Sequence, residues 1–334
     1  MKRLKKRETM GLRTAIIGAT GLVGEKLLTI LEERNFPIDK IFLFATGKGK
    51  TNEYFRGKRI RVKPIEKTEI PEVDIAFFSA GTEIPKKFAR DFVKRGAIVI
   101  DNSPVFREDK TVPLIIPEIN PKAVKKTKGI IANPNCSTII MLLPLFPIYK
   151  KWGIKRIIAS TYQSVSGAGR EALSDLVKKR NPPFYFPLTI ERNIIPHIGK
   201  PLNSGFSGEE RKMLTETQKI LGDKKIKVSS TCVRVPVRFG HSISVTAELN
   251  STFTTKEIKK ELRKFNGVVV YDEPKNAMYP HPRFVEDKDE VFVGRIRIDP
   301  VFKNGLSMWI AGDNIRKGAA TNAVQIAELL CNRR

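Results

Sequence analysis

The sequence predicts a doubly wound α/β domain together with a second, α+β domain whose sheet is antiparallel or mixed. In the first half, continuous apolar runs alternate with amphipathic segments, which is typical of parallel strands covered by helices on both faces. In the second half, apolar and polar residues alternate along the runs, which favours strands with only one buried face. The length of 334 residues agrees with about two domains.

The first domain is expected to contain short buried strands connected by helices. Strands are predicted at residues 13–17, 40–45, 73–79 and 97–101, and helices at 24–34 and 84–95. A ligand of such a domain is expected at the carboxyl ends of its strands.

The second domain is expected to contain longer strands, with helices on one face of the sheet and the other face free to meet a second subunit. Strands are predicted at residues 228–237, 241–249, 292–299 and 306–311, and a last helix at 318–330, which is expected to pack on the first domain. We therefore expect a basic arm of residues 1–9, a first domain of residues 10–135 plus 315–334, and a second of 136–314.

The cysteine count, the apolar stretches and the net charge indicate which classes of protein the chain can belong to. Three cysteines exclude a disulfide framework and fit a reducing compartment. No apolar stretch long enough for a signal peptide or a membrane span follows the basic start, so we expect a cytoplasmic protein without a membrane partner. The 61 Lys and Arg exceed the 35 Asp and Glu by 26, which raises the possibility of a polyanion partner. No aromatic-rich basic stripe supports nucleic-acid binding, so we expect none.

A glycine-rich turn follows the first predicted strand. Gly18, Gly21 and Gly24 are spaced GxxGxxG in the segment GATGLVG, between a strand and a helix. A dinucleotide pyrophosphate is bound at such a helix start by backbone N–H groups and the positive end of the helix. A tight turn without a ligand is the alternative.

Cofactor choice depends on the end of the second predicted strand. An acidic residue there would bind a ribose 2′-hydroxyl and indicate NAD, but Thr46 is followed by Lys48 and Lys50. These lysines favour the 2′-phosphate of NADP; the alternative is that they are solvated surface groups.

A second motif surrounds Cys136 in the segment NPNCST. Asn135 directly precedes an apolar helical run, which is typical of a helix N-cap. Cys136 then lies in the first turn, where backbone N–H groups and the helix dipole favour a thiolate and an oxyanion. Cys232 and Cys331 lack this setting and are interpreted as inert.

The segments STYQSVSGAG at 160–169, EERKM at 209–213, RVP with His241, and GDNIRKGAA at 312–320 follow GATGLVG and NPNCST along the chain. Taken together and in this order, from about residue 13 to about residue 330, these motifs resemble those of the aspartate-semialdehyde dehydrogenases. The resemblance implies a Rossmann-like domain and the NADPH-dependent reduction of L-aspartyl-4-phosphate to L-aspartate 4-semialdehyde, with release of inorganic phosphate. That step leads to lysine, diaminopimelate, methionine and threonine. It also implies a homodimer or homotetramer. Two departures are Ile140, where many relatives carry Gln, and the 48–50 loop, where relatives usually carry Ser-x-Arg-Ser.

The resemblance also implies a role for each matching residue. Cys136 is the nucleophile that forms a thioester, His241 the acid/base, and Gln163 the residue that orients the substrate. Seven positions separate Arg234 from His241, so they face opposite sides of a regular strand, but residues 236–240 are expected to break it. The binding roles are: Arg234 for the α-carboxylate; Glu209 for the ammonium; Arg107, Asn135 and Lys212 for phosphate; and Gly18, Thr20, Gly21, Leu22, Val23, Gly24, Thr46, Lys48, Ser166, Gly167 and Asn314 for the cofactor.

Two other enzymatic or binding hypotheses stay open. N-acetyl-γ-glutamyl-phosphate reductases share the fold and the Cys/His pair, but the segments STYQSVSGAG and EERK argue against that substrate. A catalytically inactive homologue kept as a binding protein typically loses the cysteine, whereas Cys136 is present.

Overall fold

A computed structural model of the chain describes residues 11–47 and 50–331. The described chain divides into two compact units, one ending at Pro134 and resuming at Ala319, the other running from Asn135 to Gly318. The predicted basic arm, residues 1–9, and Lys48 lie outside the described residues. No helix in residues 11–47 and 50–331 is both long enough and apolar enough to cross a membrane.

The boundaries of the units differ from the expected ones at two places. Asn135 belongs to the second unit because its side chain caps the first helix of that unit. Residues 315–318 also belong to it, since the backbone N–H groups of Ile315 and Arg316 donate to Asp313, and Arg316 pairs with Asp289 at 2.8 Å.

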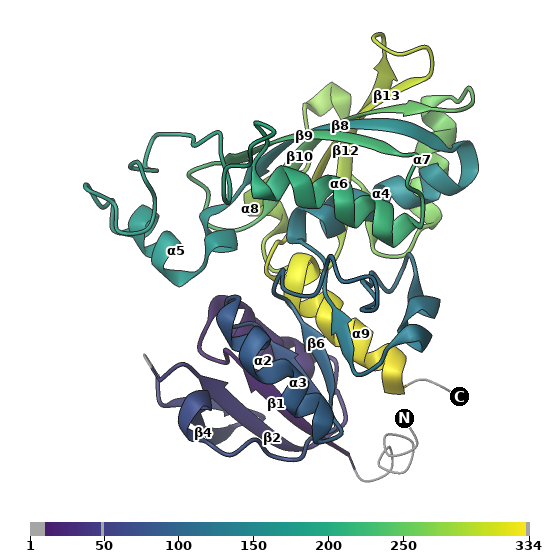
Figure 1. Ribbon diagram of the computed structural model, residues 1–334. Coiled ribbons are helices and arrows are strands. Elements are labelled where there is room, and N and C mark those ends of the chain that lie inside the picture. The colour runs from purple at the N-terminus through teal and green to yellow at the C-terminus, as the bar shows by residue number, and fades with distance from the viewer. Residues whose placement is uncertain (1–10, 48–49, 332–334) are drawn as a thin grey trace. The chain divides into compact units, whose positions relative to one another are not determined.

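The first unit is a sheet covered by helices on both faces (Figure 1). The strand order is β3-β4-β2-β1-β5-β6-β7, with β1 between β2 and β5, so the order reverses at β1. All neighbouring strands are parallel except β3 and β4. The elements are β1 (Leu12–Ile17), α2 (Leu22–Glu33), β2 (Ile38–Ala45), β3 (Asn52–Phe55), β4 (Lys58–Pro64), β5 (Ile75–Phe78), α3 (Glu83–Lys94), β6 (Ile98–Asp101), β7 (Ile130–Ala132) and α9 (Thr321–Cys331).

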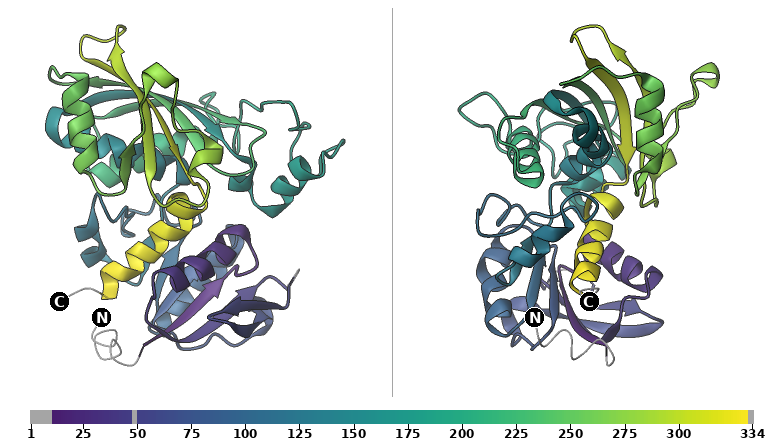
Figure 2. Two further views of the ribbon diagram at one scale, coloured as in Figure 1. Left: turned by 180° about the vertical axis from the view of Figure 1, so that it is seen from behind. Right: turned by 90° about the vertical axis from the view of Figure 1, so that its right-hand side faces the viewer.

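Helix α9 returns to the first unit at the end of the chain, as predicted, although it begins later than expected. A π-helical turn at Arg316–Ala320 precedes it. Its Ala323, Val324 and Ala327 are buried in the same core as Leu27 and Leu31 of α2. Figure 2 shows α9 (yellow) beside α2 (purple), and Arg34 and Glu328 pair between them at 2.7 Å.

The second unit is a mixed sheet with the strand order β11-β12-β13-β10-β8-β9. Helices α4 and α6 pack against one face, as Figure 1 shows. On the other face Ile158 and Tyr162 are exposed, in agreement with the one-sided burial expected from the alternation. The elements are α4 (Cys136–Trp152), β8 (Ile154–Gln163), α5 (Arg170–Val177), α6 (Gly208–Leu221), β9 (Lys227–Arg234), β10 (His241–Leu249), α7 (Thr255–Lys264), β11 (Val268–Val270), α8 (Pro282–Val285), β12 (Val291–Asp299) and β13 (Gly305–Gly312).

Strand β9 corrects one expectation. It ends at Arg234 instead of residue 237, and its pairing with β8 is parallel, whereas the alternation favours an antiparallel strand. The neighbouring strand in sequence, β10, is already paired on both sides, with β8 and β13. The chain therefore crosses from β9 over β8, and residues 235–240 form the break that the sequence predicts between Arg234 and His241.

Candidate active site

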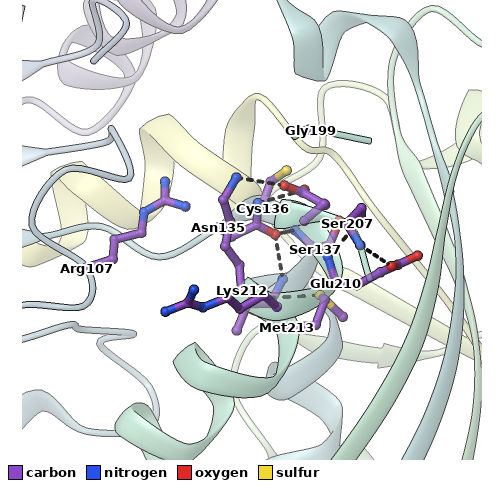
Figure 3. Close-up of polar contacts among 12 residues, drawn as sticks. Arg107, Asn135, Cys136, Ser137, Gly199, Ser207, Glu210, Lys212 and Met213 are labelled. Atoms are coloured by element: carbon purple, nitrogen blue, oxygen red, sulfur yellow. Dashed lines mark hydrogen bonds and ion pairs between the residues drawn. The ribbon is translucent and has the colours of Figure 1, made fainter. Parts of the chain in front are cut away.

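The start of α4 places Cys136 in the first helical turn. The Asn135 side chain caps the helix, accepting the backbone N–H of Ser137 at 3.0 Å and that of Thr138 at 3.3 Å (Figure 3). Residues of α4 from Ser137 to Leu145 are buried, which fixes the helix axis under the sheet. The sequence-based interpretation of a capped helix beginning at Cys136 is confirmed.

His241 faces the thiol. Its Nε2 lies 3.3 Å from Cys136 Sγ, and the ring is fully buried at the first position of β10. Burial, followed by the charge of Arg234, lowers the pKa of His241 to about 3, with Glu209 and the Gly240 carbonyl acting in the opposite direction. The imidazole is therefore neutral at physiological pH.

Ser164, to which the sequence assigned no role, hydrogen-bonds the other ring nitrogen of His241. The backbone N–H of Ser164 donates to His241 Nδ1 at 3.1 Å, and Ser164 Oγ lies at the same distance. Asn314 Oδ1 accepts from Ser164 Oγ at 3.0 Å and from the N–H of Gly240 at 2.9 Å. Asn314 Nδ2 donates to Ser166 Oγ at 3.0 Å. The predicted cofactor residues Ser166 and Asn314 thus belong to the network that orients His241.

Helix α6 contributes a buried carboxylate. A capping box between Ser207 and Glu210 fixes its first turn (Figure 3), which directs Glu209 inward. Glu209 accepts from Lys212 Nζ at 2.9 Å, Asn135 Nδ2 at 2.8 Å and Gln163 Nε2 at 3.2 Å.

Glu209 stays ionised despite its burial. Burial alone would raise the pKa of this carboxyl, but the charge and hydrogen bond of Lys212 and the two amide donors outweigh it and lower the pKa to about 2.

Arg234 ends β9 beside these groups. It is buried, and its Nη1 donates to the Ser164 carbonyl at 2.7 Å. Gly167 lies between Arg234 and His241: a Cβ on this residue would stand 3.1 Å from Arg234 Nη1 and 3.2 Å from His241 Nε2. The planar guanidinium suits a carboxylate ligand.

Two more residues that the sequence reading missed stand around the nucleophile. Glu216 Oε2 accepts the backbone N–H of Asn135 at 2.7 Å. A Cβ on Gly318 would lie 2.9 Å from Cys136 Cβ, so this position requires glycine. A periodicity analysis gives no signal for either contact, although Gly318 belongs to the GDNIRKGAA motif.

The second unit thus brings most of the predicted catalytic and binding side chains together. These are Cys136, His241, Gln163, Glu209, Lys212, Asn135, Arg234, Ser166, Gly167 and Asn314. Arg107 belongs to the first unit, where its Nη2 donates to the Asn102 carbonyl at 2.6 Å. Within the described part of the chain, no cluster of three or more His, Cys, Asp or Glu residues could hold a metal ion.

The glycine-rich turn of the first unit fits a dinucleotide phosphate. Gly18 has φ +91°, and a Cβ on it would lie 2.7 Å from the Ser79 carbonyl oxygen. A Cβ on Gly24 would collide with the Gly18 carbonyl oxygen. Gly21 is the N-cap of α2 and supplies no side-chain cap, so the helix start is left to backbone donors. Thr20, Leu22 and Val23 complete this turn and the start of α2.

A cavity of about 310 Å³ lies where β2 ends. Thr46, Lys50, Lys63 and Lys67 are among its lining residues. Lys50 is less available to a 2′-phosphate than the sequence suggests, because its Nζ forms ion pairs with Glu25 at 2.6 Å and Glu53 at 3.3 Å. The cavity is also lined by Glu66, but three lysines outnumber this one carboxylate among the described lining residues, which favours a 2′-phosphate.

Comparison with protein families gives matches over both units. Residues 13–127 match the model of the semialdehyde dehydrogenase NAD binding domain, and residues 145–317 match the model of the semialdehyde dehydrogenase dimerisation domain.

Individual relatives are similar along nearly their whole length. An aspartate-semialdehyde dehydrogenase from Aquifex aeolicus is 52% identical over 96% of this chain and 98% of its own, and one from Campylobacter jejuni is 45% identical over 95% and 96%. The crystal structure of aspartate semialdehyde dehydrogenase II complexed with ASA from Vibrio cholerae has a TM-score of 0.93 at 42% identity, over 97% and 99% of the chains. The enzyme with NADP from Candida albicans has a TM-score of 0.75 at 26% identity, over 96% and 98%.

Proposed function

Because this chain belongs to the semialdehyde dehydrogenase family, we propose that it is an aspartate-semialdehyde dehydrogenase. The reaction is the NADPH-dependent reduction of L-aspartyl-4-phosphate to L-aspartate 4-semialdehyde with release of phosphate. The observation that carries the proposal is the 3.3 Å contact between Cys136 Sγ and His241 Nε2 at a capped helix start. It supplies a nucleophile and a proton-handling partner for acyl transfer.

The first step is attack by the Cys136 thiolate on the acyl phosphate. A C–S bond forms, the C–O bond to phosphate breaks, and the acyl group is left as a thioester on Cys136. The N–H groups at the start of α4 stabilise the oxyanion of the tetrahedral intermediate. Arg107, Asn135 and Lys212 are the proposed ligands of the leaving phosphate.

The second step reduces the thioester. NADPH supplies a hydride, for which the glycine turn at Gly18–Gly24 and the cavity at Thr46 are the proposed binding site. Collapse of the resulting tetrahedral adduct releases the aldehyde and returns Cys136 to the thiolate. His241 hydrogen-bonds the sulfur and acts as the acid/base for the proton of this adduct, a hemithioacetal. Gln163 orients the substrate.

The substrate is held by its charges. Arg234 is the proposed ligand of the α-carboxylate, and Glu209 the proposed ligand of the α-ammonium. Both are buried, so each makes a strong charge-assisted contact.

The assembly is proposed to be a homodimer or a pair of such dimers. The matched dimerisation domain and the exposed apolar side chains Ile158 and Tyr162 on the face of the sheet opposite α4 support a contact between copies. A place in lysine, diaminopimelate, methionine and threonine synthesis follows from the product, and a cytoplasmic location stays a prediction.

The test is an assay of the reverse reaction with aspartate semialdehyde. NADP⁺ reduction should require both the semialdehyde and inorganic phosphate. Turnover that does not depend on phosphate, or that occurs only with the N-acetyl-glutamyl semialdehyde, would contradict the proposal.

A further inference from the structure

Glu209 and Lys212 form an ion pair inside the site. They are one helical turn apart on α6, and Lys212 Nζ lies 2.9 Å from Glu209 Oε2. The Glu209 side chain is 7% exposed and that of Lys212 is 29% exposed, so the carboxylate is fixed in the interior while the lysine reaches toward solvent. Among the described residues, Lys212 is the only cation within ion-pair distance of Glu209.

The two carboxylate oxygens of Glu209 have different partners. Oε1 accepts from two neutral amides, Asn135 Nδ2 at 2.8 Å and Gln163 Nε2 at 3.2 Å. Oε2 accepts from the Lys212 ammonium. An incoming ammonium group can therefore take over Oε2 without disturbing the amides that hold Oε1.

Neither Glu209 nor Lys212 can bind a ligand on its own without leaving the charge of the other unpaired. Drawing Lys212 away to an anion leaves Glu209 buried without its counter-charge, which is strongly unfavourable. An ammonium at Oε2 supplies that charge and releases Lys212. Arg234 does not substitute, because its Nη1 is bonded to the Ser164 carbonyl and it makes no ion pair with Glu209 among the described contacts.

We propose that the Glu209–Lys212 ion pair couples the binding of the substrate's amino group to the binding of phosphate. The inference rests on the proposed function, in which Glu209 meets the ammonium and Lys212 the phosphate. Each ligand replaces one member of the pair and frees the other member for the second ligand. Because coupling between sites is reciprocal, each ligand raises the affinity for the other by the same factor.

Two molecules that differ only in the amino group test the coupling in the wild-type enzyme. Aspartate semialdehyde carries the ammonium, and succinate semialdehyde lacks it. In the NADP⁺-dependent direction, the KM for phosphate should be at least about fivefold lower with aspartate semialdehyde. Binding gives an independent measurement: on the wild-type complex with NADP⁺, the Kd of inorganic phosphate should fall by a similar factor with L-2-aminobutyrate but not with butyrate.

Variants of the pair should remove the coupling with opposite effects on phosphate. Lys212→Gln should weaken phosphate binding and make it indifferent to the amine. Glu209→Gln should free Lys212 permanently, so phosphate should bind more tightly than to wild type when no amine is present. A merely structural role of Glu209 would not strengthen phosphate binding. Lys86→Gln is the matched control, since Lys86 and Glu83 form an i,i+3 pair of the same 2.9 Å length on the surface of α3.

The outcomes separate this inference from the proposed function. Phosphate-dependent turnover with equal phosphate KM values for the two semialdehydes, or equal Kd values with and without the amine, would overturn the coupling alone. Absence of phosphate-dependent turnover would overturn the proposed function and the coupling with it.

Discussion

His241 Nε2 lies 3.3 Å from Cys136 Sγ although 105 residues separate them in the chain. The contact depends on two local features. Asn135 fixes the start of α4, and the break after Arg234 lets β10 begin with His241 facing the thiol. The sulfur is thereby placed against a neutral imidazole within the second unit.

Cys136→Ala should abolish turnover while NADP⁺ binding is unchanged, because the thioester cannot form. A titration of NADPH fluorescence measures binding at the cofactor site, and the phosphate-dependent assay measures turnover. In the wild type, iodoacetamide should label Cys136 before Cys232, since burial raises the pKa of the Cys232 thiol to about 12, and also before Cys331. Near-normal activity in Cys136→Ala would end the assignment.

The residues around this contact show what a sequence can and cannot predict. Helix caps and glycine turns are local, so the start of α4 at Cys136 and the turn after β1 were predictable from neighbouring residues. Ser164 and Gly318 act on His241 and Cys136 through tertiary contacts, for which periodicity gives no signal.

Strand pairing is the other limit of a sequence-based prediction. Alternation in β9 predicts a strand with one buried face, but it does not reveal that the partner is β8. The β3–β4 hairpin was also missed. Its turn residues Arg56 and Gly57 both have positive φ, and Arg-Gly is not a typical pair for such a turn.

NADP(H) should be preferred over NAD(H), and Lys48→Ala should raise the KM for NADP far more than that for NAD. Lys50→Ala should have a smaller effect, because Lys50 is already paired with Glu25 and Glu53. Lys86→Ala, on α3, is the control for loss of a surface charge. Equal use of both cofactors by the wild type would show that the lysines do not select the 2′-phosphate.

Acid should destabilise the folded protein through His241. Its pKa is lowered to about 3 in the folded state, so between pH 3 and 6.5 the unfolded chain binds more protons, and stability falls as the pH falls through this range. Between pH 7.5 and pH 5 this group should contribute a loss on the order of 2 kcal/mol. Urea unfolding of wild type and His241→Gln at both pH values measures it. An equal loss in both proteins would contradict a neutral, buried His241.

The net charge of +26 should be diffuse surface charge instead of a nucleic-acid site. DNA binding should be weak, insensitive to sequence and lost at modest salt, because it would rest on phosphate contacts alone. A salt titration of duplex binding, with the full chain and with residues 1–9 removed, measures this. Tight binding at physiological salt that survives the truncation would revive the nucleic-acid hypothesis.

Glu209 should decide between the two acyl-phosphate substrates. Aspartyl phosphate carries a free ammonium, whereas N-acetyl-glutamyl phosphate carries a neutral amide at that position. A substrate that takes Lys212 for its phosphate and offers no ammonium leaves the buried Glu209 carboxylate without a counter-charge, which costs roughly 3 kcal/mol or more. Glu209→Gln removes the charge, so it should sharply reduce kcat/KM for aspartate semialdehyde and should change kcat/KM much less for a substrate without the amine.

The control is Glu83→Gln, which removes the carboxylate of the surface pair on α3. The measurement is the ratio of kcat/KM for aspartate semialdehyde and N-acetyl-glutamate semialdehyde in each protein. A wild type that prefers the N-acetyl substrate, or a ratio unchanged in Glu209→Gln, would show that Glu209 is not the ammonium ligand.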